Sequence, residues 1–292
     1  MLLHPMTVLF SDWSVFLDRW LVPRMQSSAL PLLVSVSSAA LFLLQLPDNA
    51  DAQEVLLQDY KYGRSQGDTT SCSWRCLLLT LQWPGAFCQS LGEGRVCQIP
   101  PSVNHWTLHG LWPVREDRCC DCWPMFHSDV QEVEAELLVH WPSLLRHNSS
   151  FQFWRNEWRK HGSCAACVEG INSPLRYFQL CLKLRRQFNI DQVLEDAGIT
   201  PSCHRTYKVS EVRRVLVPHV GDIHEIQCVR DKQDREVWFQ IKIPLSRNLT
   251  VGCSPAADAE ADWRSSGGHP CPPQVPFFYL PINHEQPKEP CG

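Results

Sequence analysis

The 292-residue chain has no excess of positive charge: 27 lysines and arginines stand against 31 aspartates and glutamates, and the formal net charge is −4. This excludes a generally basic protein that coats nucleic acid, so any polyanion must be bound by a local cluster of charge. The chain shows no internal repeat, which gives no support to a repeat array. Around Glu157, Asn156 and Lys160 stand where a metalloprotease helix of the H-E-x-x-H type has its two histidines, and this excludes that class.

A convincing membrane span is also missing. Residues 29–46 are apolar and follow Arg24, but Pro31 and several serines make this stretch a poor span. Ala50 and Ala52 supply a small-x-small pattern, so we expect a signal peptide that is cleaved after Ala52. An uncleaved signal anchor is the alternative. After cleavage, no stable membrane association is expected.

These features divide the chain into two parts. Residues 1–52 are expected to be an N-terminal extension and signal peptide, and residues 53–292 a single domain with a Pro- and Gly-rich C-terminal tail. The stretch before Met25 is unusual for a signal peptide, so Met1 and Met25 both stay open as the start.

Cysteine, by contrast, is abundant. Fifteen cysteines extend from Cys72 to Cys291, which indicates a framework and not one local metal knuckle. Disulfides persist in oxidising compartments, so we place the protein in the secretory pathway, and sequons at Asn148 and Asn248 agree with this. Thiolate ligation of a metal within residues 119–167 is the alternative, which an oxidising compartment disfavours. Because fifteen is odd, at least one thiol is free or pairs with another chain.

The apolar pattern predicts strands and helices that interleave without regular alternation. Strands are expected at residues 73–83, in a short segment through His109, and at 225–229, 236–243 and 277–280. Helices are expected at 130–145 with a break at Trp141-Pro142, at 151–161 ended by Gly162, at 173–188 capped by Ser173, and at 191–197 and 210–217. Loops are expected after Pro84 and at 254–274. This order favours an α+β fold, with a central, mainly antiparallel sheet, helices around it and stabilising disulfides.

Two short segments carry the chemistry. Residues 106–113 read WTLHGLWP and residues 153–164 read FWRNEWRKHGSC. Each carries one histidine, and the second adds a carboxylate and an ammonium within one helical turn. One histidine that accepts a proton and another that gives one are the minimum equipment for cutting RNA without a metal.

The second segment, as a helix, places unusual residues on one face. The spacing i, i+3, i+4, i+7, i+8 puts the following on that face: Phe153, Asn156, Glu157, Lys160 and His161. Trp154 and Trp158 then take the face toward the core. The alternative is a solvated face with ordinary i, i+4 pairs.

The first segment, as a strand, points Thr107 and His109 to one side and Trp106 and Leu108 to the other. Gly110 is expected to allow a turn, and Trp112-Pro113 to end the strand. A lone histidine on a strand is usually structural. His109 gains significance because His161 is a possible partner.

The two segments resemble the active-site segments of the ribonuclease T2 family, the secreted and lysosomal endoribonucleases, which read roughly WTIHGLWP and FWxHEWxKHGTC. Residues 81–88 resemble the family's first strand and 276–279 its last, so the resemblance covers about 73–282. It implies that residues 53–292 form a catalytic domain that cleaves single-stranded RNA. DNA lacks the nucleophile and is not a substrate. No metal or cofactor is expected, and we expect a monomer.

The resemblance also implies roles. His161 matches the general base that takes the proton from the ribose 2′-hydroxyl, and His109 the general acid that protonates the leaving 5′-oxygen. Lys160 and Glu157 match groups that stabilise the pentacovalent phosphorane. The product is a 2′,3′-cyclic phosphate that is then hydrolysed. One neutral and one protonated histidine favour mildly acidic pH.

The chain departs from the family pattern at two positions. Asn156 replaces a third histidine, and an amide can still donate to phosphate but carries no charge, so weaker phosphate binding is expected. Val114 replaces an Asp that helps to read a base. Trp112 is a candidate to stack on a base, and Gln82 and Phe153 to line a second base pocket. Core packing is the equal alternative for these three.

By resemblance, three cysteine pairs are expected: Cys88–Cys97, Cys119–Cys164 and Cys228–Cys271. Cys253 matches a family position, but its usual partner would stand near Pro244. The other cysteines have no assigned partner. One alternative function also stays open, a secreted protein of this fold that binds or signals with reduced activity, and Asn156 is its only support in the sequence.

Overall fold

The computed structural model describes residues 72–92, 94–114, 119, 122–254 and 267–292. The expected signal peptide and its cleavage site lie outside these ranges, as do Cys120 and residues 255–266 of the expected loop. The division of the chain at residue 52 therefore stays a prediction.

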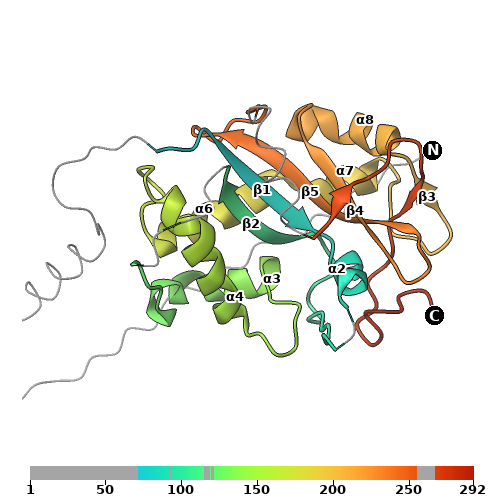
Figure 1. Ribbon diagram of the computed structural model, residues 1–292, viewed down its shortest axis with the longest axis horizontal. Helices are drawn as coiled ribbons and strands as arrows, with labels where there is room; N and C mark the ends of the chain where they lie inside the picture. The colour runs from blue at the N-terminus through green and yellow to red at the C-terminus, as the bar shows by residue number, and fades with distance from the viewer. Residues whose placement is uncertain (1–71, 93, 115–118, 120–121, 255–266) are drawn as a thin grey trace, which may run out of the picture. The chain divides into compact units, whose positions relative to one another are not determined.

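The centre of the fold is a sheet of mainly antiparallel strands (Figure 1), which confirms the α+β class. The main path runs β2-β1-β5-β4-β6, and β7 pairs with β3 and, in parallel, with β5. The strands are β1 Cys76–Gln82, β2 Thr107–Pro113, β3 Thr206–Tyr207, β4 Glu225–Arg230, β5 Glu236–Ser246, β6 His269–Pro270 and β7 Phe277–Phe278. The strand β6 falls in a stretch that was expected to be loop.

The helices flank this sheet (Figure 1), with α3 and α4 beside β2. They are α2 Pro84–Ser90, α3 Glu134–His140, α4 Ser150–Glu157, α5 Ser163–Ala165, α6 Pro174–Gln187, α7 Ile190–Asp196 and α8 Val209–Val220. Single turns complete them: η1 His127–Asp129 and η2 Gln131–Val133 are 3₁₀ helices, and η3 Trp158–Gly162 is a π-helix. Ser173 caps α6 as expected, since its side chain accepts from the Arg176 N–H.

Two of the predicted element boundaries were wrong. In the segment expected to be helical at 130–145, the break at Trp141-Pro142 is confirmed, because Trp141 leaves the helical conformation and Pro142 follows it. The α-helix begins only at Glu134, however, and does not resume after the break. The loop expected after Pro84 begins with α2 instead. There proline occupies the first turn, where its missing N–H costs no hydrogen bond.

The two faces of the sheet differ in chemistry. On β1, the side chains of Leu77, Leu79 and Leu81 are fully buried in the main core, the same cluster that holds residues of α6 and α8. The alternate residues Leu78, Thr80 and Gln82 point to the other face, since successive side chains of a strand alternate. That second face is also buried, but much of it is polar.

A β-bulge interrupts β2 at His109. Gly110 lies opposite Thr80 and Leu108 lies opposite Leu81, so His109 is an extra residue between two consecutive pairs. The turn expected at Gly110 was therefore wrong, and the strand continues to Pro113. The bulge places Leu108 and Leu111, three residues apart, in the same core.

A π-helical turn follows α4 directly. The Ser163 N–H donates to the carbonyl of Trp158, five residues earlier, so the helix that was expected to end at Gly162 continues through it. Trp154 and Trp158 are fully buried in the core, as the sequence predicted. Gly162 is needed here because a Cβ at this position would overlap the Trp158 ring.

Six disulfides join the described residues, and the three expected pairs are confirmed. The other three are Cys72–Cys167, Cys76–Cys253 and Cys203–Cys291. Cys253 thus pairs with Cys76 at the start of β1, and not with a cysteine near Pro244, where the family pattern has its usual partner. Cys181 is a free, buried thiol. None of the helices in the described part of the chain is long and apolar enough to cross a membrane.

We expect Trp154→Ala to lower the free energy of unfolding by about 3–5 kcal/mol, because it empties a fully buried site and removes the N–H that donates to the Trp141 carbonyl. Urea unfolding measures the change. The neighbouring exposed residue offers a control, Arg155→Ala, which should change stability by less than about 0.5 kcal/mol. Equal losses in the two variants would contradict this packing.

Candidate functional site

A buried polar layer lies on one face of the sheet. Neighbouring strands place Thr107, Gln82, Gln240 and Gln227 opposite one another in one row, and Gly110, Thr80, Lys242 and Glu225 in the next. Thr80, Gln240 and Lys242 are completely buried. Buried polar groups are costly unless they are paired, so a layer of this kind points to function more than to stability.

His109 lies over this layer at the bulge of β2. Its Nδ1 is 2.5 Å from Nε2 of Gln240 on β5, and its own carbonyl accepts a hydrogen bond from the Trp141 indole at 3.0 Å. The bulge turns the imidazole toward the polar layer, while Leu108 and Leu111 on either side enter the core. Backbone and side chain of His109 are both fixed.

Trp112 connects this strand to α4. Its indole Nε1 donates a hydrogen bond of 2.9 Å to Oε2 of Glu157, and both side chains are buried, at 8% and 7% exposure. Lys242 Nζ lies 5.8 Å from the indole centroid. Gly110 leaves the space that this pair needs, because a Cβ there would overlap Trp112 Nε1 and lie 2.5 Å from Glu157 Oε2.

The π-helical turn brings His161 to the same indole. The ring centroids of Trp112 and His161 are 5.3 Å apart, and those of Trp112 and His109 are 5.0 Å apart. Phe153, two turns earlier, approaches His109 at 6.3 Å. Lys160 is exposed, and its charge acts on both histidines and on Glu157.

Burial makes both imidazoles poor proton acceptors. Burial, and then the charges of Lys242 and Lys160, lowers the pKa of His109 to about 3. Burial, Lys160 and His109 lower the pKa of His161 to about 3. A bound anion would oppose the lysine charges and raise both pKa values.

Burial has the opposite effect on the carboxyl group. It raises the pKa of Glu157 to about 7, although the Trp112 hydrogen bond and the Lys160 charge both favour the ionised form. Around pH 5 the site therefore holds a largely protonated carboxyl beside two largely neutral imidazoles. Such groups can exchange protons with a ligand in both directions.

The structure brings together most of the residues that the sequence singled out. His109, Trp112, Phe153, Glu157 and His161 contact one another through the Trp112 and His109 rings. Gln82 lies in the polar layer, almost fully buried, and its Oε1 has no hydrogen-bond partner within the described ranges.

One further predicted residue meets the site less directly. Asn156 is half-buried one residue before Glu157. The ring of Trp112, expected to stack on a base, faces His161 and Lys242. The base-binding roles of Trp112, Gln82 and Phe153 stay predictions.

Sequence reasoning missed Gln240 and Lys242. Both lie at alternate positions of β5, whose sequence was recognised as a strand. The signal was available: a glutamine and a lysine at i and i+2 in an otherwise apolar run must share one face. Only the pairing of β5 with β1, and of β1 with β2, shows that this face is the one below His109.

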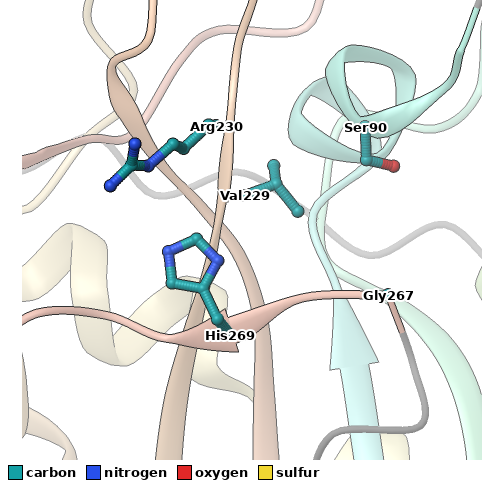
Figure 2. A pocket seen from close by; sticks show the side chains of 5 residues that line it. All are labelled: Ser90, Val229, Arg230, Gly267 and His269. Carbon is teal, nitrogen blue, oxygen red and sulfur yellow. The ribbon is translucent and has the colours of Figure 1, made fainter.

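A separate pocket lies at the opposite end of the sheet, with a volume of about 420 Å³ (Figure 2). It is lined by Ser90, Val229, Arg230, Gly267 and His269. The carboxylate of buried Glu236 contacts both basic side chains, Arg230 Nε at 3.2 Å and His269 Nε2 at 2.7 Å. Because this carboxylate pairs with both basic side chains, neither of them is left without a partner, in contrast to the buried polar atoms of the His109 site.

Within the ranges that the structure describes, no group of three or more His, Cys, Asp or Glu side chains is arranged to hold a metal ion.

Comparisons with known proteins point to one family. A model of the Ribonuclease T2 family matches residues 74–257. Ribonuclease Oy of Magallana gigas is 32% identical over 219 residues, which cover 72% of this chain and 98% of that protein. Ribonuclease T2 of Homo sapiens is 36% identical over 178 residues, 60% of this chain and 67% of that protein. The crystal structure of human RNase T2 superposes with a TM-score of 0.61 at 30% identity, covering 71% of this chain and 99% of that structure.

We expect Glu157→Gln to stabilise the protein more at pH 7.5 than at pH 4.5. The raised pKa means that the folded state binds a proton which the unfolded state releases above about 4.5, so the wild type loses stability as pH rises from there to about 7. Glutamine removes this loss, which amounts to roughly 3 kcal/mol for a shift of this size. Urea unfolding at both pH values measures it. A stability difference that is the same at both would contradict a raised pKa.

We expect Gly110→Ala to lower the free energy of unfolding by about 1–3 kcal/mol, because the new methyl group displaces Trp112 or Glu157. Urea unfolding measures the loss of stability, and indole fluorescence reports the displacement of Trp112. Gly92→Ala is the matched control, since a Cβ there meets no atom within 4 Å. If both variants behaved alike, the tight approach of Trp112 to Gly110 would be wrong.

Proposed function

This chain belongs to the ribonuclease T2 family and is a ribonuclease of that type, and we propose that it cleaves single-stranded RNA by metal-independent transphosphorylation through a 2′,3′-cyclic phosphate. One observation carries the proposal: two imidazoles on different elements, His109 and His161, flank the same indole at 5.0 and 5.3 Å. Such a pair can take a proton at one point of a phosphodiester and give one at another.

His161 is the general base. Its lowered pKa keeps the imidazole neutral at mildly acidic pH, so it can accept the proton of the ribose 2′-hydroxyl. Its buried Nδ1 has no hydrogen-bond partner among the described residues. The 2′-oxygen then attacks the adjacent phosphorus. DNA has no such hydroxyl and is not cleaved by this route.

His109 is the general acid that protonates the leaving 5′-oxygen. In the ligand-free protein its pKa of about 3 leaves it mostly neutral at pH 5. The negative charge of a bound phosphodiester raises this pKa, so the acid is formed when the substrate binds. As pH rises, the protonated form is lost, and activity falls. The optimum is therefore acidic.

Lys160 and Glu157 stabilise the charge that develops on the phosphorane. Lys160 offers an exposed ammonium next to His161. Glu157 accepts the Trp112 N–H at Oε2, so a protonated Oε1 can donate to a phosphoryl oxygen below pH 7. Asn156 supplies an uncharged donor where the family motif has histidine, and we expect weaker phosphate binding from it.

The cysteines and sequons indicate the cellular compartment of the protein. Six disulfides among the described residues indicate an oxidising compartment, and we infer a secreted or lysosomal monomer. Asn248 is exposed in a turn after β5 and Asn148 is half-buried before α4, so both stay candidate glycosylation sites.

The test is cleavage of single-stranded RNA by the purified protein at pH 5 in excess EDTA, with product ends identified by mass spectrometry. We expect 2′,3′-cyclic phosphate ends. His109→Ala or His161→Ala should reduce kcat by about 10²–10⁴-fold while the fold is retained. His204 is an exposed histidine that is not among the site residues. His204→Ala is therefore the matched control and should keep wild-type activity.

Three outcomes would contradict the proposal. They are cleavage that is lost in EDTA and restored by zinc, cleavage of a strand with 2′-deoxyribose at the scissile position, and near-normal rates in both histidine variants. Tight RNA binding without cyclic-phosphate products would favour the alternative of a binding protein with reduced activity.

A further inference from the structure

The amide of Gln240 holds one ring nitrogen of His109. The Nε2 atom of Gln240 lies 2.5 Å from Nδ1 of His109, across 131 residues of sequence. The other amide atom, Oε1, is buried and has no hydrogen-bond partner in the part of the chain that the structure describes. Both atoms belong to a fully buried side chain in the middle of β5. An unpaired buried oxygen beside an imidazole requires an explanation.

A half-turn of the amide gives this oxygen a partner. It exchanges Nε2 and Oε1 without moving the rest of the side chain, and it places the oxygen against Nδ1. A protonated imidazole carries N–H groups at both nitrogens, so its Nδ1–H can then donate to Oε1. The orphaned acceptor is satisfied only when His109 carries a proton on Nδ1.

We propose that Gln240 is a positioning residue for the proton transfer by His109, in which Oε1 accepts the Nδ1–H and leaves Nε2 as the nitrogen that faces the scissile phosphate. The inference rests on the proposed function. In the step itself, the Nε2–H bond breaks, the P–O5′ bond breaks, and the proton joins the 5′-oxygen. The Nδ1–H stays on the neutral ring and keeps its bond to Oε1.

The charges around His109 explain why an amide suits this position. Lys242 lies on the same strand as Gln240, Lys160 and His161 face the ring from η3, and Glu157 approaches from α4 through Trp112. A carboxylate in place of the amide would oppose the two lysines and hold the proton on His109 more tightly. A neutral acceptor orients the ring without making it a weaker acid.

The same row of the sheet provides a matched control. Gln227 on β4 lies opposite Gln240, is equally buried, and donates from Nε2 to Glu225 at 2.9 Å. Its neighbour Gln240 stands between it and His109. Replacing Gln227 therefore changes the buried polar layer to a similar extent without removing the contact to Nδ1.

The experiment compares Gln240→Met, Gln240→Glu and Gln227→Met with the wild type in the full-length mature protein. Kinetics with a short RNA substrate are measured from pH 3.5 to 8, and the imidazole ¹⁵N signals are recorded by NMR. For Gln240→Met we expect kcat to fall about 10–100-fold with little change in KM, since orientation of the acid is part of its contribution. Its His109 Nδ1 signal should move.

Gln240→Glu should shift the basic limb of the kcat profile to higher pH, by about one unit or more, because the carboxylate stabilises the imidazolium. A purely structural role of Gln240 would lower stability and leave this limb in place. Gln227→Met should leave the basic limb of the kcat profile and the His109 Nδ1 signal where they are in the wild type.

The proposal is overturned if Gln240→Met keeps wild-type kcat and an unchanged Nδ1 signal, or if Gln240→Glu leaves the basic limb where it was. The second result decides the matter if Gln240→Met does not fold. A wild-type protein that cleaves no RNA overturns the proposed function instead, and the movement of the Nδ1 signal between wild type and the Gln240 variants still decides whether this contact exists.

Discussion

The hydrogen bond from the Trp112 indole to the Glu157 carboxyl is the contact on which the site depends. It joins β2, at one edge of the sheet, to α4, which follows about forty residues later. Both partners are almost fully buried, and each would be costly to bury alone. His109 and His161 reach a common centre only because each packs against this indole. Gly110 keeps the space free in which the bond forms.

Two local irregularities of the backbone orient His109 and His161. A bulge adds one residue to β2 at His109, and a π-helical turn adds one residue per turn to the helix that carries His161. Each lets a polar side chain leave the regular period of its element, while leucines and tryptophans on either side stay in the core. The Cys119–Cys164 disulfide anchors the end of this helical segment to the chain that follows β2.

The electrostatics of the site follow from its burial. A sheet face with Thr80, Gln240 and Lys242 fully buried beneath His109 is unfavourable for stability. The same burial lowers the pKa of both histidines and raises that of Glu157, so the three groups stand close to neutral charge before a substrate arrives. The main charges near a bound phosphodiester are then those of Lys160 and Lys242, which attract it.

Much of this could be predicted from the sequence, because local patterns determined it. Short apolar segments indicated the strands, and Ser173 indicated the start of α6. The resemblance of two segments to a family implied the two histidines and the three disulfides that the fold then joined. Tertiary structure alone decided the rest. The bulge at His109, the π-turn at Trp158–Gly162 and the pairing of Cys253 with Cys76 depend on which strands and helices become neighbours. Gln240 and Lys242 read as ordinary strand residues until β5 pairs with β1, because periodicity shows which residues share a face but not what that face will meet.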